Sequence, residues 1–338
     1  MTNMIRTSGL VKRYGKVVAL DGLDLEVPKG TVLGLLGPNG AGKTTAVRIL
    51  TTLLEADDGL AEVAGLDVRK DSRKVREKIG LSGQAAAVDE HLTGFENLDM
   101  VGRLYHMGRQ ASRDRARELL RRFELEDAAD RPAKTYSGGM RRRLDLAAAL
   151  VAKPEVLFLD EPTTGLDPRS RAQMWETIYE LARGGSTVLL TTQYMEEADR
   201  LADDIVVIDR GRKIAQGNAD QLKAQVGGER VEVVVESMDD VPVTATILGR
   251  ISHEEVQIDE PVRKVTAAVT GGVDILGDVL QRLREGECGI VDIGLRRPTL
   301  DDVFLSLTGH TAEEVAEDGE DGERSEETEE VREKEAVR

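Results

Sequence analysis

Cysteine, aromatic side chains and long apolar runs are all scarce in this 338-residue chain. The single cysteine, Cys288, can form neither an internal disulfide nor a thiolate metal cluster, which fits a reducing compartment. Aromatic residues make up only 3% of the chain, so the core must be aliphatic. No stretch approaches the ~20 apolar residues of a membrane-spanning helix, and the first ten residues lack a signal-peptide pattern. Any membrane role is therefore expected to come through a partner chain.

Positive charge is also in deficit, with 46 Lys and Arg against 63 Asp and Glu and a net charge of −17. Residues 311–338 hold 13 acidic and 4 basic residues, so this tail carries about half of the excess. A segment so acidic and so poor in large apolar residues is expected to be disordered. The negative balance argues against nucleic-acid binding, because phosphate contacts need Lys and Arg.

The apolar pattern predicts an α/β fold. Residues 5–27 alternate apolar and polar positions between turn signals at Gly15, Asp21-Gly22 and 28–30, which indicates short antiparallel strands. An Arg-, Leu- and Glu-rich stretch over 90–123 indicates a small helical subdomain. Strands and helices alternate elsewhere, which predicts a largely parallel sheet with helices on both faces. The expected strands are 31–36, 156–159, 187–191 and 205–208, and the expected helices are 43–54, 138–151, 169–182 and 195–202.

A polar stretch with Gly227-Gly228, over residues 217–230, indicates a domain boundary. We expect a first domain over 1–220, with the helical subdomain at about 88–152. A small α+β domain over 221–309 is expected next, with strands at 231–235 and 262–269 and a helix at 273–283. The acidic tail then occupies 310–338.

Residues Gly37–Thr44 match the phosphate-binding pattern G-x-x-x-x-G-K-[ST]. The glycines let backbone N–H groups close around phosphates, Lys43 neutralises β- and γ-phosphate charge, and Thr44 offers its hydroxyl to Mg²⁺. The pattern follows an expected strand and opens an expected helix, whose positive end points at the same anions. This context predicts an ATP site with Mg²⁺.

A second pattern, Val156–Pro162, places two carboxylates at the end of an apolar strand. Asp160 can hold Mg²⁺ through water, and Glu161 can polarise the attacking water. Taken alone, such a pair usually turns onto the surface. The combination of this carboxylate pair with the phosphate loop favours a hydrolytic site. Two adjacent carboxylates at a buried strand end also need a cation or a proton nearby.

The segment Tyr136–Met140 resembles the LSGGQ signature of ATP-binding-cassette (ABC) ATPases, with Tyr and Met at its two ends and Ser-Gly-Gly intact. Alone, Ser-Gly-Gly also fits a loop with a helix N-cap. The resemblance implies a P-loop cassette with a mixed, largely parallel sheet, an antiparallel region and a helical subdomain. It further implies that Ser137, Gly138 and Gly139 face the γ-phosphate bound by a second subunit, so that a homodimer is expected.

Other positions carry over from the resemblance one at a time. Tyr14 stands where the family has an aromatic residue that stacks on adenine, and Gln84 resembles the glutamine that senses Mg²⁺ and touches the membrane partner. Gln193 departs from the usual histidine. Its amide can donate a hydrogen bond to the γ-phosphate but cannot carry a proton as imidazole can, so Glu161 is expected to act as the base.

Three sets of candidate site residues follow. The catalytic candidates are Glu161, Lys43 and Gln193, and the Mg²⁺ candidates are Thr44, Gln84 and Asp160. The ATP-contacting candidates are Tyr14, Gly37, Pro38, Asn39, Gly40, Ala41, Gly42, Lys43, Thr44, Thr45, Gln84, Ser137, Gly138 and Gly139.

The runs Gln193–Asp199 and Leu295–Leu305 narrow the resemblance to the daunorubicin-resistance type of ATP-binding subunit. This type implies a drug-exporting ATPase on the cytoplasmic face of the cell membrane, working with a separate membrane permease. A soluble cassette ATPase acting on ribosomes or nucleic acid is the alternative, but one motif set, an acidic surface and no long heptad insertion speak against it. Intact Lys43, Asp160 and Glu161 speak against a non-catalytic scaffold. The Arg141–Arg143 run is expected to be a solvated helix face.

Overall fold

The computed structural model describes residues 2–83, 88–225, 229–253, 255–296 and 298–308. The chain divides into two compact units, one ending at Ala219 and the other comprising Asp220–Gly309. Each is described by itself. The acidic tail and Gln84 lie outside the described residues.

The first unit contains two sheets. The antiparallel sheet has the order β2-β1-β4-β5, and the larger sheet has the order β10-β9-β3-β8-β7-β6. In the larger sheet, β9, β3, β8, β7 and β6 run parallel, and β10 pairs antiparallel with β9 at one edge. The strands are β1 (Asn3–Tyr14), β2 (Val17–Pro28), β3 (Val32–Leu36), β4 (Asp58–Val63), β5 (Leu66–Asp67), β6 (Ile79–Ser82), β7 (Val156–Asp160), β8 (Thr187–Thr192), β9 (Asp204–Asp209) and β10 (Arg212–Gly217).

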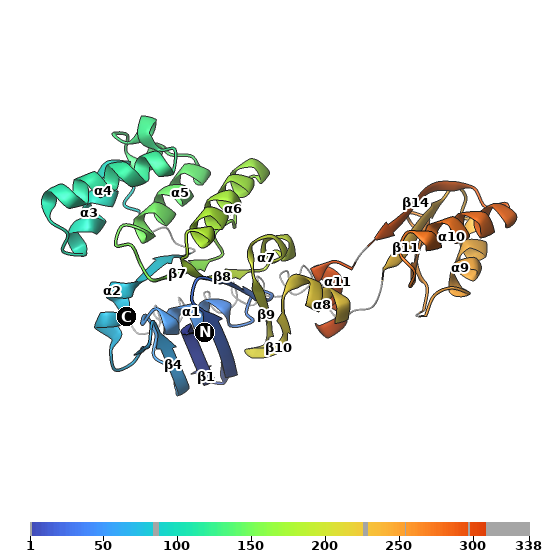
Figure 1. Ribbon diagram of the computed structural model, residues 1–338, viewed down its shortest axis with the longest axis horizontal. Coiled ribbons are helices and arrows are strands. Elements are labelled where there is room, and N and C mark those ends of the chain that lie inside the picture. The colour runs from blue at the N-terminus through green and yellow to red at the C-terminus, as the bar shows by residue number, and fades with distance from the viewer. Residues whose placement is uncertain (1, 84–87, 226–228, 254, 297, 309–338) are drawn as a thin grey trace, which may run out of the picture. The chain divides into compact units, whose positions relative to one another are not determined.

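Helices cover both faces of the larger sheet (Figure 1). The helices of this unit are α1 (Lys43–Leu50), α2 (Ser72–Lys78), α3 (Gly94–Leu104), α4 (Arg109–Arg122), α5 (Gly138–Ala149), α6 (Pro168–Arg183) and α7 (Met195–Leu201), with single 3-10 turns at Glu126–Ala128 and Ala133–Thr135. The alternation of strand and helix thus gives the mixed, largely parallel sheet that the sequence predicts.

Alternate residues of the buried strands divide between two aliphatic clusters. On one face, Leu157 and Leu159 of β7 pack in a cluster with residues of α4, α5 and α6. On the other face, Phe158 packs with residues of α1 and of the antiparallel sheet. Strands buried on both faces read as continuous apolar runs, which is why Val156–Leu159 precedes the two carboxylates without a polar residue.

The region expected to form several short strands is instead a hairpin of two 12-residue strands. Asp21-Gly22, read from the sequence as a turn, lies inside β2. The pairing shifts there, because Leu10 is opposite Leu23 and Val11 is opposite Asp21. Gly22 has a φ of 80°. This is the signature of a β-bulge with a left-handed glycine, so the turn prediction was wrong while the antiparallel pairing was right.

The second unit contains an antiparallel sheet of order β12-β13-β11-β14 and a core of its own. Its elements are α8 (Ala219–Gln225, of which Ala219 belongs to the first unit), β11 (Arg230–Val235), α9 (Asp240–Gly249), β12 (Gln257–Asp259), β13 (Lys264–Ala268), α10 (Asp274–Glu285), β14 (Ile290–Arg296) and α11 (Leu300–Thr308). The sequence predicted β11, β13 and α10 within a few residues. It did not predict α9, β12, β14 or α11, and α8 lies in the stretch read as a polar boundary.

Candidate nucleotide-hydrolysis site

The phosphate-loop residues connect β3 to α1 at the carboxyl edge of the parallel sheet. Gly42 caps α1 with a φ of 102°, and no side chain caps the helix there. A Cβ on Gly42 would lie 2.4 Å from the carbonyl oxygen of Ala19 in β2. Glycine is thus required by both conformation and space. No side chain caps the first turn of α1, and the N-terminus of a helix is where an anion can accept hydrogen bonds from backbone N–H groups.

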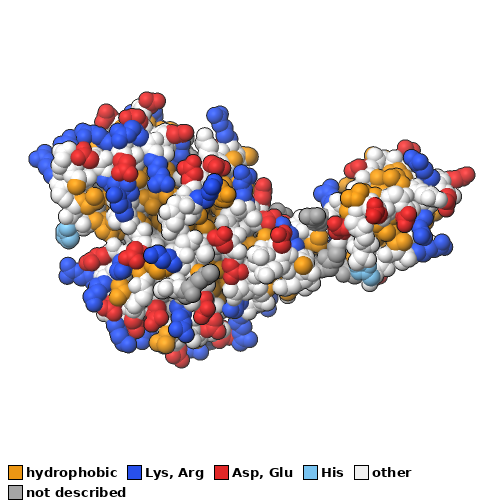
Figure 2. All heavy atoms as spheres, in the orientation of Figure 1, with side chains coloured by type: hydrophobic (Ala, Val, Ile, Leu, Met, Phe, Trp, Pro, Cys, Tyr) orange, Lys and Arg blue, Asp and Glu red, His pale blue; other side chains and the backbone are white. Residues whose placement is uncertain are grey.

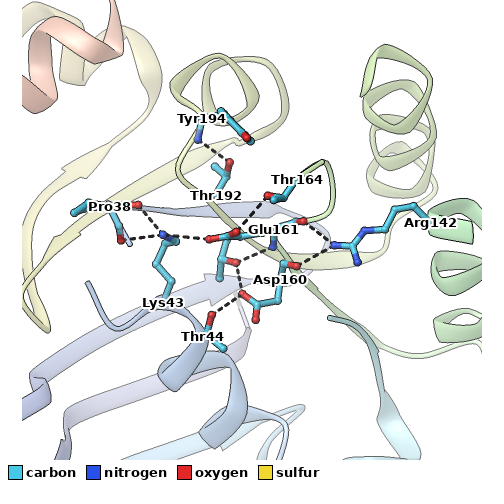
Figure 3. Close-up of polar contacts among 11 residues, drawn as sticks. Pro38, Lys43, Thr44, Arg142, Asp160, Glu161, Thr164, Thr192 and Tyr194 are labelled. Atoms are coloured by element: carbon cyan, nitrogen blue, oxygen red, sulfur yellow. Dashed lines mark hydrogen bonds and ion pairs between the residues drawn. The ribbon is translucent and has the colours of Figure 1, made fainter. Parts of the chain in front are cut away.

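Lys43 is buried and points back into the loop (Figure 3). Its Nζ donates to the carbonyl oxygens of Gly37 at 2.7 Å and Pro38 at 3.0 Å. It also lies 3.4 Å from Oε1 of Glu161. Burial lowers the pKa of Lys43, and the Glu161 carboxylate opposes that shift. An ammonium held by two neutral carbonyls and one carboxylate can change partners when a phosphate arrives.

Asp160 ends β7 beside the start of α1. Its Oδ1 accepts from Thr44 Oγ1 at 3.3 Å and from Thr191 Oγ1 at 2.5 Å. Thr191 lies on the neighbouring strand β8 and is fully buried. Thr191 was not among the site residues predicted from the sequence. The polar pair Thr191-Thr192 at the end of a parallel strand was the available signal, because the ends of such strands meet at one edge.

Glu161 is held by its backbone as well as by its side chain. Its φ of 49° is left-handed, which is uncommon outside glycine. Its N–H donates to both the carbonyl and the hydroxyl oxygen of Thr191, each at 3.1 Å. Its Oε2 accepts from Thr164 Oγ1 at 3.2 Å, while Oε1 faces Lys43. The carboxylate is therefore buried against a cation and not turned onto the surface.

Arg142 contradicts the expectation of a solvated arginine face. Its neighbours Arg141 and Arg143 bond the exposed carboxylates of Glu90 and Glu124, but Arg142 is buried. Its guanidinium donates to backbone carbonyls just after β7. Arg142 shares the inner face of α5 with the buried Asp145, since helical neighbours at i, i+3 lie on one face.

The remaining predicted residues lie at different places. Gln193 follows β8, whose last residue Thr192 accepts from the N–H of Gly37 at 3.3 Å. This backbone contact brings Gln193 beside the phosphate loop. Tyr14 is exposed at the tip of the β1-β2 hairpin, with Lys12 over its ring at 5.7 Å. Gln84 lies outside the described residues.

The signature residues form the exposed start of α5. Ser137 caps the helix by accepting from Met140 N at 3.2 Å, and Ser137 and Gly138 are exposed. Tyr136, which replaces the usual leucine, is buried and donates from its hydroxyl to Ala128 O at 2.6 Å. The tyrosine therefore packs in the core of the helical subdomain, while Ser137 and Gly138 lie on the surface and Gly139 is half-buried.

A family model described as "ABC transporter" matches residues 20–164 of the chain. A daunorubicin resistance ATP-binding protein of Streptomyces coeruleorubidus is 58% identical over 91% of this chain and 96% of its own length. A daunorubicin/doxorubicin resistance ATP-binding protein of Streptomyces peucetius is 47% identical over 93% of this chain and 94% of its own length.

Solved structures show the same cassette. One from Clostridium perfringens, described as part of an ABC transporter complex, has a TM-score of 0.61 and 27% identity over 67% of this chain and 92% of its own length. A dimeric ATP-binding cassette in a post-hydrolysis state with ADP and Pi has a TM-score of 0.59 and 26% identity over 64% of this chain and 98% of its own length.

The chain belongs to the ABC transporter family. It is an ATP-binding subunit that hydrolyses ATP. Within the family it falls with the ATP-binding proteins of the drug-resistance type, as Gln193–Asp199 and Leu295–Leu305 predicted. The nucleic-acid alternative is not supported. Within the described residues, no helix is both long and apolar enough to cross a bilayer.

Proposed function

We propose that this chain is the motor of a drug exporter, in which two copies bind two ATP molecules and drive a separate membrane permease from the cytoplasmic face. The proposal that the chain hydrolyses ATP at this site rests on the buried contact between Lys43 and Glu161, which lie 3.4 Å apart. It brings the phosphate-loop cation and the carboxylate that would activate water to the same point.

In the proposed reaction, the loop Gly37–Thr44 binds the phosphates through its N–H groups and Lys43 moves from carbonyl partners to phosphate oxygens. Glu161 orients the attacking water and accepts its proton. Gln193, beside Gly37, donates its amide to the γ-phosphate, and Tyr14 stacks on adenine. Phosphoryl transfer to water depends chiefly on such placement and charge neutralisation.

The donor set at the end of β7 fits Mg²⁺. Thr44 Oγ1 and Asp160 Oδ1 are both oxygens and lie 3.3 Å apart. Hydroxyl and carboxylate oxygens are the kind of ligand that Mg²⁺ prefers. Thr44 would hold the ion directly, Asp160 through water, and Gln84 would join them. The ion would neutralise β- and γ-phosphate charge.

The exposed Ser137 and Gly138 support a dimer, because neither has a described contact with the phosphate loop of its own chain. We assign Ser137, Gly138 and Gly139 to the γ-phosphate bound by a second copy. Hydrolysis would then require two chains, and rate per chain should rise with protein concentration.

Drug cargo is inferred from the relatives, two of which are named for daunorubicin resistance. The proposal expects a multi-span membrane protein to be encoded beside this chain, and co-expression of the two tests it. The pair should copurify and lower daunorubicin accumulation in cells, and Lys43→Ala should abolish the drug effect without abolishing copurification. Copurification with ribosomes alone, or unchanged accumulation, would refute the transport proposal.

A further inference from the structure

Arg142 holds the backbone that carries the catalytic carboxylate. Its Nε donates to Pro162 O at 2.8 Å, and its Nη2 donates to Asp160 O at 3.1 Å and Glu161 O at 2.6 Å. Three consecutive carbonyls thus converge on one guanidinium, as Figure 3 shows in part. A planar fork with five N–H groups is suited to such a set.

The same guanidinium reaches the end of β6. Its Nη1 donates to Gly83 O, the residue just before Gln84. It also lies 3.9 Å from Oδ2 of Asp145, which accepts from Ser82 Oγ at 2.6 Å. Asp145 is buried one helical turn after Arg142 on α5. The positive charge of the guanidinium is therefore balanced by the buried carboxylate of Asp145.

The turn that Arg142 holds is strained. Glu161 adopts the left-handed region at φ 49°, which is unfavourable for a residue other than glycine. Such conformations persist only where surrounding contacts over-determine them. Thr191 holds the N–H side of this turn, and Arg142 holds the carbonyl side. The direction of the Glu161 side chain depends on both.

We propose that Arg142 is a positioning residue for ATP hydrolysis, which couples helix α5 to the direction of the Glu161 carboxylate. Ser137, which caps α5, is the residue that the proposed dimer places on the partner's nucleotide, so the coupling role rests on that proposed function. A shift of α5 on dimer closure would move the guanidinium and, with it, the Asp160–Pro162 backbone. Each chain would then align its own base in response to the nucleotide held by its partner.

The test compares Arg142→Lys with Arg143→Lys, a change of the same kind on the same helix at a residue paired with exposed Glu124. A lysine has one nitrogen and cannot span the three carbonyls. We expect single-turnover hydrolysis at saturating ATP to slow at least about tenfold in Arg142→Lys, because small misplacements of a reacting group can cost about 100-fold. ATP affinity should stay within about twofold, because Arg142 has no described contact with Gly37–Thr44. Arg143→Lys should change neither quantity.

A double-mutant cycle separates positioning from general damage. In a Glu161→Gln background, Arg142→Lys should slow the residual hydrolysis by less than about twofold. The proposed effect of Arg142 depends on the Glu161 carboxylate, which this background lacks. An unchanged rate in Arg142→Lys alone, or an equal slowing in both backgrounds, would overturn the proposal. If Arg142→Lys does not fold, Arg142→Gln enters the same cycle. A wild-type chain that hydrolyses ATP without dimerising would refute the proposed dimer while leaving the Arg142–Glu161 cycle intact.

Discussion

The buried pair of Lys43 and Glu161 gives a prediction that stability measurements can test without nucleotide. Both side chains are at most 6% exposed, and Glu161 has one further described side-chain partner, Thr164. Lys43→Met keeps the length of the side chain and removes its charge, leaving a buried carboxylate uncompensated. Breaking a buried pair in this way costs about 3–5 kcal/mol.

Glu161→Gln is milder, because the ammonium keeps the carbonyls of Gly37 and Pro38. Losing one partner of a charged hydrogen bond costs about 1–3 kcal/mol. The double variant removes both charges, so its loss should fall short of the sum of the two single losses by about 1–3 kcal/mol.

Urea unfolding followed by tryptophan emission provides the assay. Trp175, the single tryptophan, is buried in α6 of the first unit and reports the unfolding of that unit. Equal m-values across the four proteins are the control, because a changed slope signals a changed denatured state. Single losses that add to the double loss within about 0.5 kcal/mol would refute the pairing.

Three further outcomes are expected. Gln193→His should leave ATPase activity within about tenfold, because Glu161 is the proposed base; a complete loss in a steady-state assay would assign the glutamine another role. Burial raises the pKa of Glu197, so the stability that its carboxyl contributes is present below its unfolded pKa and lost as pH rises through the folded value. The unfolding free energy of the wild type relative to Glu197→Gln should therefore fall as the pH rises above about 4.3, the ordinary pKa of a glutamate, and a flat or rising difference would contradict this. Gly42→Ala should lower the melting temperature more than Gly40→Ala, because only the first methyl meets a carbonyl, at 2.4 Å; equal shifts in a thermal melt would argue against that crowding.

The residues that carry the chemistry of the site were easier to predict from the sequence than the residues that hold them in position. Gly37–Thr44 and Asp160-Glu161 follow apolar strands, and the carboxyl ends of parallel strands meet at one edge, so their convergence could be inferred. Arg142 could not be placed in the same way. In the run Arg141–Arg143, three identical side chains differ only in which face of α5 carries them, and burial is decided by the packing of α5 against β6 and β7.

The second unit was predicted least well, for a local reason. Helix α9 reads Asp-Val-Pro-Val-Thr-Ala-Thr-Ile-Leu-Gly, and its β-branched residues favour strand while its proline is tolerated only in a first turn. Packing of Val241 and Leu248 in the core of this unit overrides those preferences. Strand β14 has no buried residue, so it lacks the alternation by which a strand is recognised.

The most direct test of the nucleotide site is single-turnover ATP hydrolysis by the purified chain with magnesium, with ATP affinity measured in parallel. Wild type should bind and hydrolyse ATP, Lys43→Ala should lose affinity, and Glu161→Gln should keep affinity while hydrolysis falls at least about 100-fold. Hydrolysis by Glu161→Gln at the wild-type rate, with binding intact, would contradict the assignment of the base.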